Sequence, residues 1–526
     1  MNESNSTGKP RSRVRDAIYA AIVTIALVGG LNAAVGLLER AGVLHTHIPD
    51  DVVQFVDGAL FELDGDVYRT TAYAEESLLR QEFARDKGDA LRVFVVGASF
   101  AMGTPYQSQG RPGGTGGIAS FLRAELSRRA PGRRVEIVNA SSGGADSGRV
   151  ADVAAQVLEF EPDAIVVATC NNDAHVTPSQ MRRLLQEQPG YRLMRKMLQS
   201  GKEVERSWYA PTDEPSQDLE KQLRANITKI IESARAKGVP VLLATLPINL
   251  RYPGFNPIEA GEGPEGPELL FTVPTQGIPP MPADLRQIPP CEGGVWMAWA
   301  GANEAAVPLL LACSQGTEGR GMLPPFAPSY LALAELGTGR VDAWAGDVLR
   351  QTWGDCLTDG MLRYQAGDYD AAVDGLLQCE EVAEALQWAG LSRWRQGQLT
   401  DARAMLRQAV ELDPRNRCRP SLNEAIRELA TAPGVTLVDL EARAEAAAVD
   451  GLPGPDLFLD SCHMNWRGYA AMADAVLDGL ETAVPGMPTS PEPLDGDALA
   501  RTLGLSPGDN RAQILHIMGQ PQLGPE

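Results

Sequence analysis

The stretch "LRVFVVGASFAMG" (residues 91–103) decides the fold class, because an apolar run ends there in a turn of small residues. Residues 91–96 are typical of a strand that is buried on both faces. The turn that follows carries a single hydroxyl group, on Ser99. A strand that ends by presenting one serine raises the question of which group elsewhere in the chain acts on it.

The segments around this stretch alternate between apolar strands and amphipathic helices. This alternation is typical of a parallel sheet covered by helices on both faces, so we predict an α/β domain. The predicted strands are 91–96, 135–139, 163–169, 239–245 and 434–440, and the predicted helices are 117–129, 149–160, 217–237 and one that follows Trp466.

An insertion of nearly 180 residues separates the fourth and fifth predicted strands. Its first part, 252–345, is a Pro- and Gly-rich loop followed by a mixed segment without a clear pattern. Its second part, 346–418, contains a repeat in which glycines and alanines recur at an offset of thirty residues. Small residues at these positions let antiparallel helices pack closely, so we predict tetratricopeptide-like helix pairs. These pairs provide either a docking surface for a partner protein or a helical spacer.

The N-terminal segment predicts a membrane anchor. Residues 17–38 hold 22 positions without a charge, enough for a helix to cross a bilayer at about 1.5 Å per residue. The four basic residues in 1–16 place this tail in the cytoplasm and the rest of the chain outside. A cleaved signal peptide and a buried core helix are the alternatives. Residues 39–88 then form a juxtamembrane segment, which connects the anchor to the α/β domain.

Four polar segments follow predicted strands or precede the final helix. In an open parallel sheet, the loops at the carboxyl ends of the strands line the site. We therefore expect these segments to meet and to combine a serine, loop glycines, an amide cluster and an Asp/His pair. The segments are "VVGASFAMG" (95–103), "NASSGGADS" (139–147), "ATCNNDAHV" (168–176) and "LFLDSCHMNW" (457–466).

The last segment carries Asp460 three residues before His463. The carboxylate of Asp460 can hold the imidazole from Nδ1 while Nε2 faces Ser99. A serine nucleophile needs this arrangement, because a base must take its proton and a carboxylate must fix the tautomer of that base. A helix-capping aspartate beside an incidental histidine is the alternative. The other four histidines are His45, His47, His175 and His516.

These segments, in this order, resemble the motifs of the SGNH (GDSL-type) hydrolase superfamily. "GASFAMG" matches the first motif, with Ser99 at the nucleophile position. The resemblance implies that Gly144 donates its backbone N–H to the oxyanion, with Gly143 as the alternative register. It also implies that Asn172 of "CNND" is the side-chain oxyanion donor. The implied fold is a flavodoxin-like, three-layer sheet domain formed by residues 89–251 and 419–485, followed by a tail at 486–526.

The closing motif, "DSCH", makes Asp460 and His463 the remaining members of the implied triad. Two residues depart from the family pattern. Ala98 replaces the usual aspartate before the nucleophile, and Cys170 replaces a common glycine. Neither departure removes a catalytic group.

The repeats and the N-terminal segment extend the resemblance, over about residues 50–485, to a bacterial subgroup of SGNH proteins with tetratricopeptide repeats. The loop at 252–345 is poorly matched. The expected function is a membrane-anchored, extracytoplasmic serine esterase that removes acetyl esters from an envelope or exported glycan, without a metal or an organic cofactor. Two alternatives remain: an O-acetyltransferase that acts on a polysaccharide, and a non-enzymatic envelope scaffold that binds partners through its repeats.

Charge and cysteine content restrict the partners further. A net charge of −21 argues against nucleic acid as a partner. The seven cysteines contain no C-x-x-C pair, so no zinc-binding spacing is present. Because the number is odd, at least one thiol stays unpaired within the chain. Cys170 and Cys462 are either disulfide-bonded or two small buried thiols, and Cys291 with Cys313 is another candidate pair. Asp173 and His175 either contact substrate or lie in a surface turn.

Overall fold

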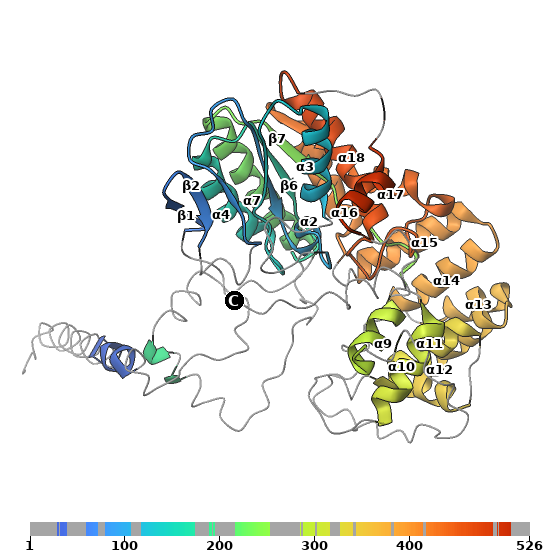
Figure 1. Cartoon of the computed structure of the whole chain (residues 1–526). Coiled ribbons are helices and arrows are strands. Elements are labelled where there is room, and N and C mark those ends of the chain that lie inside the picture. Colours follow the sequence, from blue (N-terminus) through green and yellow to red (C-terminus); the bar gives the residue numbers. More distant parts are fainter. Residues whose placement is uncertain are drawn as a thin grey trace, which may run out of the picture. The chain divides into compact units, whose positions relative to one another are not determined.

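A computed structural model of the whole chain shows two compact units (Figure 1). One unit comprises residues 1–54 and 176–208, and the other comprises residues 55–175 and 209–526. In the first unit, the backbone N–H of Gly190 donates a hydrogen bond to Asn32. The described residues are 29–30, 32–38, 59–71, 79–106, 117–173, 189–191, 193–194, 216–252, 285, 288–299, 302–315, 327–339, 343–379, 383–413, 417–487, 492 and 494–505.

The predicted fold class included a transmembrane helix over 17–38, and this part of the prediction is wrong. Within the described residues, the structure contains no helix whose length and apolar character would let it cross a membrane. The tail 1–16 and most of 17–38 lie outside the described residues. The fold class is therefore mixed α/β, with a parallel sheet and many helices.

The second unit is organised around a five-stranded parallel sheet, at the positions that the apolar runs predicted. Its strand order is β5-β4-β6-β7-β8, the order of flavodoxin-like doubly wound sheets. In such a sheet, ligands bind beyond the carboxyl ends of the strands where the order reverses, which here is at β4 and β6. The strands are β4 (Leu91–Gly97), β5 (Val135–Asn139), β6 (Ala164–Ala168), β7 (Val241–Ala244) and β8 (Val435–Val438).

Helices cover both faces of this sheet (Figure 1). On one face, α3 (Ile118–Arg129) packs against α18 (Trp466–Ala483). On the other, α7 (Ser216–Ala236) packs against α4 (Ser147–Val157) and α16 (Pro420–Leu429). Their apolar stripes join the strands in one hydrophobic core, so the sheet has the three layers that its apolar strands predicted. Shorter helices in this unit are α2 (Ser99–Met102), η2 (Leu158–Phe160), α17 (Leu440–Ala447), η5 (Val449–Gly451) and α19 (Gly496–Thr502).

A small antiparallel sheet precedes β4 in the segment that was assigned only as juxtamembrane. It consists of β1 (Phe61–Asp64), β2 (Val67–Thr70) and β3 (Glu82–Ala84). The two-residue turn between β1 and β2 is Gly65-Asp66, and Gly65 has a φ of +62°. A Gly-Asp pair between two strands is a sequence signal that predicts such a hairpin, and the sequence interpretation overlooked it.

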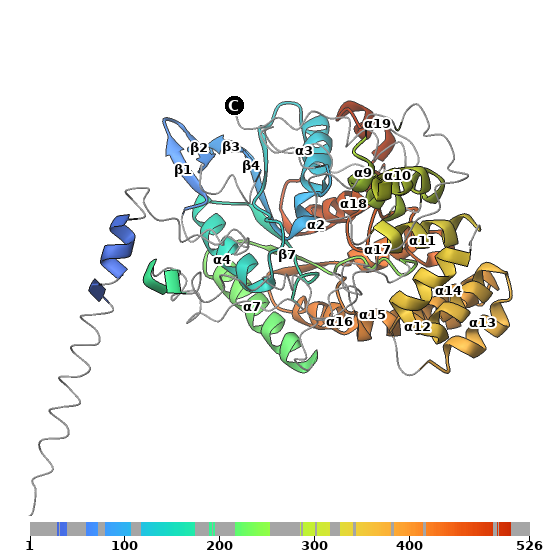
Figure 2. The same cartoon turned by 90° about the horizontal axis from the view of Figure 1, so that it is seen from below.

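The insertion is helical wherever the structure describes it. The part at 252–345 for which no fold was predicted contains helices α9 to α11, and the repeat forms the two helix pairs α12/α13 and α14/α15 (Figure 2). A Cβ on Gly390 would lie 2.7 Å from Leu406 Cγ, and a Cβ on Gly360 would overlap Leu376. The two glycines therefore permit the same close approach in both pairs. The helices are α9 (Pro290–Trp299), α10 (Asn303–Gln315), α11 (Ala327–Thr338), α12 (Ala343–Gln365), α13 (Tyr369–Leu376), α14 (Ala383–Arg395) and α15 (Leu399–Leu412).

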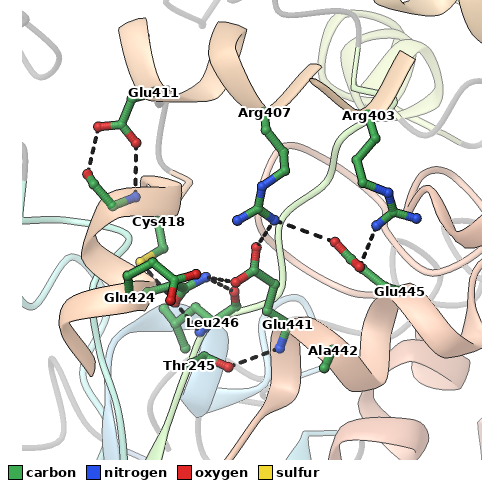
Figure 3. Close-up of polar contacts among 12 residues, drawn as sticks. Thr245, Leu246, Arg403, Arg407, Glu411, Cys418, Glu424, Glu441, Ala442 and Glu445 are labelled. Atoms are coloured by element: carbon green, nitrogen blue, oxygen red, sulfur yellow. Dashed lines mark hydrogen bonds and ion pairs between the residues drawn. The ribbon is translucent and has the colours of Figure 1, made fainter. Parts of the chain in front are cut away.

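An ion-pair network joins the last repeat helix, α15, to the helices beside the sheet. Figure 3 shows Arg407 of α15 between Glu441 and Glu445 of α17, while Arg403 pairs with Glu445. Glu441 is almost fully buried and also pairs with Arg427 of α16 at 2.8 Å. Because a buried carboxylate is costly without such partners, this network fixes the repeats to the sheet domain.

Candidate active site

The strand β4 and the turn after it position the hydroxyl of Ser99. All seven residues of β4 are buried, and a Cβ on Gly97 would overlap the backbone oxygen of Ala168. Only glycine therefore allows β4 and β6 to lie this close at their carboxyl ends. Ser99 is the first residue of the short helix α2, which Gly103 ends with a φ of +96°. This strand–turn–helix unit leaves Ser99 half-buried at the carboxyl end of β4.

The structure brings Ser99, His463 and Asp460 into one hydrogen-bonded line. His463 Nε2 lies 2.8 Å from Ser99 Oγ, and His463 Nδ1 lies 2.6 Å from Asp460 Oδ2. Ser99 and His463 are 364 residues apart in the sequence, so the contact depends entirely on the fold. This is the relative placement of nucleophile, base and orienting carboxylate that the sequence pattern predicted.

The turn that carries Asp460 and His463 is held by its own hydrogen bonds. Asp460 Oδ1 accepts from the backbone N–H groups of Cys462, at 2.9 Å, and His463, at 2.6 Å. Immediately after the turn, Asn465 caps α18 by accepting from Gly468 N–H at 3.0 Å. The carboxylate therefore has one oxygen fixed by the backbone and the other directed at the imidazole ring. Both side chains therefore lie in a hydrogen-bonded turn that immediately precedes α18.

Burial and charge act in opposite directions on the pKa values of this pair. Burial alone disfavours the imidazolium, but the Asp460 carboxylate outweighs it and holds the pKa of His463 well above its usual value. Burial alone also disfavours the carboxylate, but the His463 ring and two backbone N–H groups lower the pKa of Asp460. The protein thus favours the imidazolium form of His463, which is the form that the histidine of a serine-nucleophile triad takes during the reaction.

The loops with Gly144 and Asn172 are tied to the same edge of the sheet. The N–H of Ser142 donates to Gly97 O at 3.0 Å, which places the glycine loop beside the end of β4. Gly144 is exposed and has a φ of +68°, whereas Gly143 has no such left-handed conformation. Asn172 Nδ2 donates to Ala145 O at 3.1 Å. Since an amide nitrogen carries two hydrogens, this bond fixes the group and leaves the second N–H for another acceptor.

Asp173 does not lie in a surface turn, because its side chain is buried. Its Oδ1 accepts hydrogen bonds from both the backbone N–H and the hydroxyl of Ser147. Burial, together with the nearby Asp146, raises the pKa of Asp173 to about 7. Asp173 therefore links the loop of Asn172 to the start of α4, directly after the glycine loop. His175 lies outside the described residues.

Two residues that the sequence interpretation missed support the turn that carries Asp460 and His463. Asn249, which follows β7, donates from Nδ2 to the backbone oxygen of Asp460 at 2.7 Å. Arg417, which follows α15, donates to the backbone oxygen of Asn249 at 3.0 Å. The junction between the repeats and the sheet domain thus contacts the segment that holds Asp460. The partners are 211 and 168 residues apart, and no local sequence signal relates them.

The disulfides differ from the pair considered between Cys170 and Cys462. Cys170 is bonded to Cys418, and Cys462 is the free cysteine. The candidate pair Cys291–Cys313 is present, and a third disulfide joins Cys356 to Cys379. The free thiol of Cys462 lies 3.8 Å from His463 Nδ1. Within the described part of the chain, Asp460, Cys462 and His463 form the one group with the side chains and spacing to hold a metal ion.

Comparisons with known proteins add no family assignment. No protein-family model matches the chain, and a search of curated proteins finds no match. Function is therefore inferred from the geometry of the site and from the motif resemblance. The strongest of these observations is the pair of hydrogen bonds that connects Ser99 to His463 and His463 to Asp460.

Proposed function

We propose that this protein is a serine hydrolase of the SGNH type that cleaves acyl esters. One observation carries the proposal: His463 Nε2 is 2.8 Å from Ser99 Oγ while Nδ1 is 2.6 Å from the Asp460 carboxylate. A hydroxyl, an imidazole and a carboxylate in this order are the groups needed for nucleophilic acyl transfer. The positions of the loops with Gly144 and Asn172 at the same sheet edge support it further.

The reaction would proceed in two halves. Ser99 Oγ attacks the ester carbonyl while its proton passes to His463 Nε2, and the carbonyl oxygen becomes an oxyanion. The N–H groups of Ser99 and Gly144 and the free N–H of Asn172 stabilise this charge. The alcohol then leaves with the proton from His463, and an acyl–serine remains. Water, deprotonated by His463, attacks the acyl–serine and releases the carboxylic acid and Ser99.

We further propose acetyl esters on an envelope or exported glycan as the substrate class, and an oxidising compartment as the location of the enzyme. Three disulfides in the described chain support this location, because disulfides persist outside the reducing cytoplasm. Analysis of products formed from an acetyl donor, with and without glycan, tests whether water or a sugar hydroxyl accepts the acyl group.

The nucleophile is tested with a fluorophosphonate probe and with p-nitrophenyl acetate. We expect the wild type to be labelled at Ser99 and to hydrolyse the ester. Ser99→Ala should lose the label and lower kcat by roughly 10⁴-fold or more. If folded wild-type protein is not labelled and has no esterase activity, the proposed function is wrong, and the non-enzymatic scaffold becomes the better account of the chain.

A further inference from the structure

The turn at Asp460–His463 contains a second set of chemical groups besides the triad. The ligand atoms of Asp460, Cys462 and His463 all lie within 4.8 Å of one another. Cys462 Sγ is 3.8 Å and Asp460 Oδ2 is 2.6 Å from the same atom, His463 Nδ1. The thiol of Cys462 and the carboxylate of Asp460 therefore both lie near Nδ1 of His463, whereas Nε2 of the same ring contacts Ser99. The acyl-transfer steps use the carboxylate and the ring but not the thiol.

We propose that Asp460, Cys462 and His463 form an inhibitory site for a zinc-class divalent cation. Zinc bonds of about 2.3 Å to sulfur and about 2.0 Å to nitrogen or oxygen, at tetrahedral angles, separate sulfur from nitrogen by about 3.5 Å. The Sγ–Nδ1 distance of 3.8 Å agrees with this value. The same bond lengths separate nitrogen from oxygen by about 3.3 Å. The imidazole ring must therefore withdraw from Asp460 by less than about 1 Å.

Backbone hydrogen bonds hold these three residues in a turn that can bind an ion. The N–H groups of Cys462 and His463 both donate to Asp460 Oδ1. They fix the turn while Oδ2 keeps lone pairs for a metal. A thiolate, an imidazole and a carboxylate together select Zn²⁺, or its substitute Co²⁺, over the oxygen-seeking Mg²⁺ and Ca²⁺. Three protein ligands leave the fourth position to water, so the ion is expected to exchange with the solvent.

Occupation of the site would stop acyl transfer through the histidine tautomer. In the neutral form of His463, which is the form that acts as a base, Nδ1–H donates to Asp460 and the lone pair of Nε2 accepts from Ser99. When Zn²⁺ takes the lone pair of Nδ1, the ring proton moves to Nε2, and Cys462 releases its thiol proton to the solvent. The ring remains neutral, but Nε2 now carries a hydrogen and cannot take the proton of Ser99. Zinc binding thus releases one proton and removes the general base.

Metal binding itself is tested with Co²⁺ on the native, unreduced protein. Cys462 is its one free cysteine, so a cobalt–thiolate charge-transfer band in the near ultraviolet reports on this site alone. We expect the band in the wild type and in Ser99→Ala, and no band in Cys462→Ser. Absence of the band from the wild type, or its persistence in Cys462→Ser, would overturn the proposal. This test does not depend on esterase activity.

The inhibitory effect rests on the proposed function and is tested separately with ZnCl₂ and p-nitrophenyl acetate. Cys462→Ser keeps the backbone bond to Asp460, and its inhibition is measured relative to its own activity without zinc. Its half-inhibitory zinc concentration should rise at least tenfold above that of the wild type. Equal sensitivity of the two proteins would show that zinc acts elsewhere and would overturn the proposal while leaving the hydrolase intact. A protein that binds Co²⁺ through the thiol but hydrolyses no ester would instead contradict the proposed function.

Discussion

Cys418, between the repeats and α16, is disulfide-bonded to Cys170, which lies two residues before Asn172. The bond joins positions 248 residues apart, so it ties the helical insertion to the loop with the proposed oxyanion donor. The hydrogen bonds from Arg417 to Asn249 and from Asn249 to Asp460 connect the same junction to the turn that carries Asp460 and His463. The repeats therefore support two loops of the site.

Loss of this disulfide should lower both stability and activity. We expect the double variant Cys170→Ser/Cys418→Ser to unfold with a free energy about 2–5 kcal/mol lower than the wild type. Its kcat on p-nitrophenyl acetate should also fall, because Asn172 loses a covalent anchor. Thermal unfolding and steady-state kinetics measure the two effects. Cys356→Ser/Cys379→Ser is the matched control, since that disulfide lies within the repeats. Equal losses of kcat in the two variants would contradict this role of Cys170–Cys418.

Asn172→Ala should slow catalysis and leave substrate binding nearly unchanged. The amide is fixed by its bond to Ala145 O, and a preorganised oxyanion donor acts mainly in the transition state. Its removal typically costs about 10²–10³-fold in kcat. Steady-state kinetics with p-nitrophenyl acetate should therefore show a fall of kcat with little change of KM, while the thermal unfolding midpoint checks the fold. A kcat within threefold of the wild type would remove Asn172 from the oxyanion site.

The sequence predicted the sheet well because its three central strands, β4, β6 and β7, are short apolar runs that are fully buried. β4, for example, has no exposed residue, and such a run carries its own signal. The hairpin β1–β2 was missed even though Gly65-Asp66 marks its turn. The helices α9 to α11 were missed because proline and glycine dominate much of 252–345, which obscures any helical period.

The candidate triad was visible in the sequence because Asp460 and His463 are neighbours, and their spacing reflects a local geometry. The supporting residues were not visible, for a physical reason. Asn249 acts on a backbone oxygen 211 residues away, and disulfide connectivity such as Cys170–Cys418 cannot be deduced from the positions of cysteines alone. Long-range partners of this kind are set by the tertiary fold, and a single sequence carries no record of them.

Asp173→Asn should change how stability depends on pH. The pKa of Asp173 is raised to about 7 in the folded protein, against about 3.9 in an unfolded chain. Between these values the folded state binds one more proton than the unfolded state. Its stability therefore falls as pH rises through this window, by up to about 1.4 kcal/mol per unit. Asparagine does not titrate, so Asp173→Asn does not lose stability through this group as the pH rises.

The measurement is chemical denaturation of wild type and Asp173→Asn at pH 5, 6, 7 and 8. We expect the stability of the variant, relative to the wild type, to increase steadily up to about pH 7 and then to level off. The asparagine oxygen can still accept from Ser147, so the fold should be retained. A difference between the two proteins that is constant across this range would contradict the raised pKa of Asp173.

Close packing within the repeats predicts opposite effects for two glycines. A Cβ on Gly390 would lie 2.7 Å from Leu406 Cγ and 3.2 Å from Leu406 N, so Gly390→Ala should destabilise the protein by about 1–3 kcal/mol. Gly375, also helical, has nothing within 4 Å of the added Cβ. Gly375→Ala should be neutral or slightly stabilising, because alanine favours helix. Urea denaturation compares the two, and equal effects would argue against the close helix pair.

The network around Glu441 predicts that docking of the repeats depends on a buried charge. Glu441 is 2% exposed and pairs with Arg407 and Arg427. Glu441→Gln removes the charge that these guanidinium groups share, so unfolding should require about 2–4 kcal/mol less free energy. Arg350→Gln is the control, because Arg350 pairs with the exposed residues Asp355 and Asp359, and such surface pairs contribute about 0–1 kcal/mol. If urea denaturation gives both variants the same small loss, the network does not hold the repeats to the sheet domain.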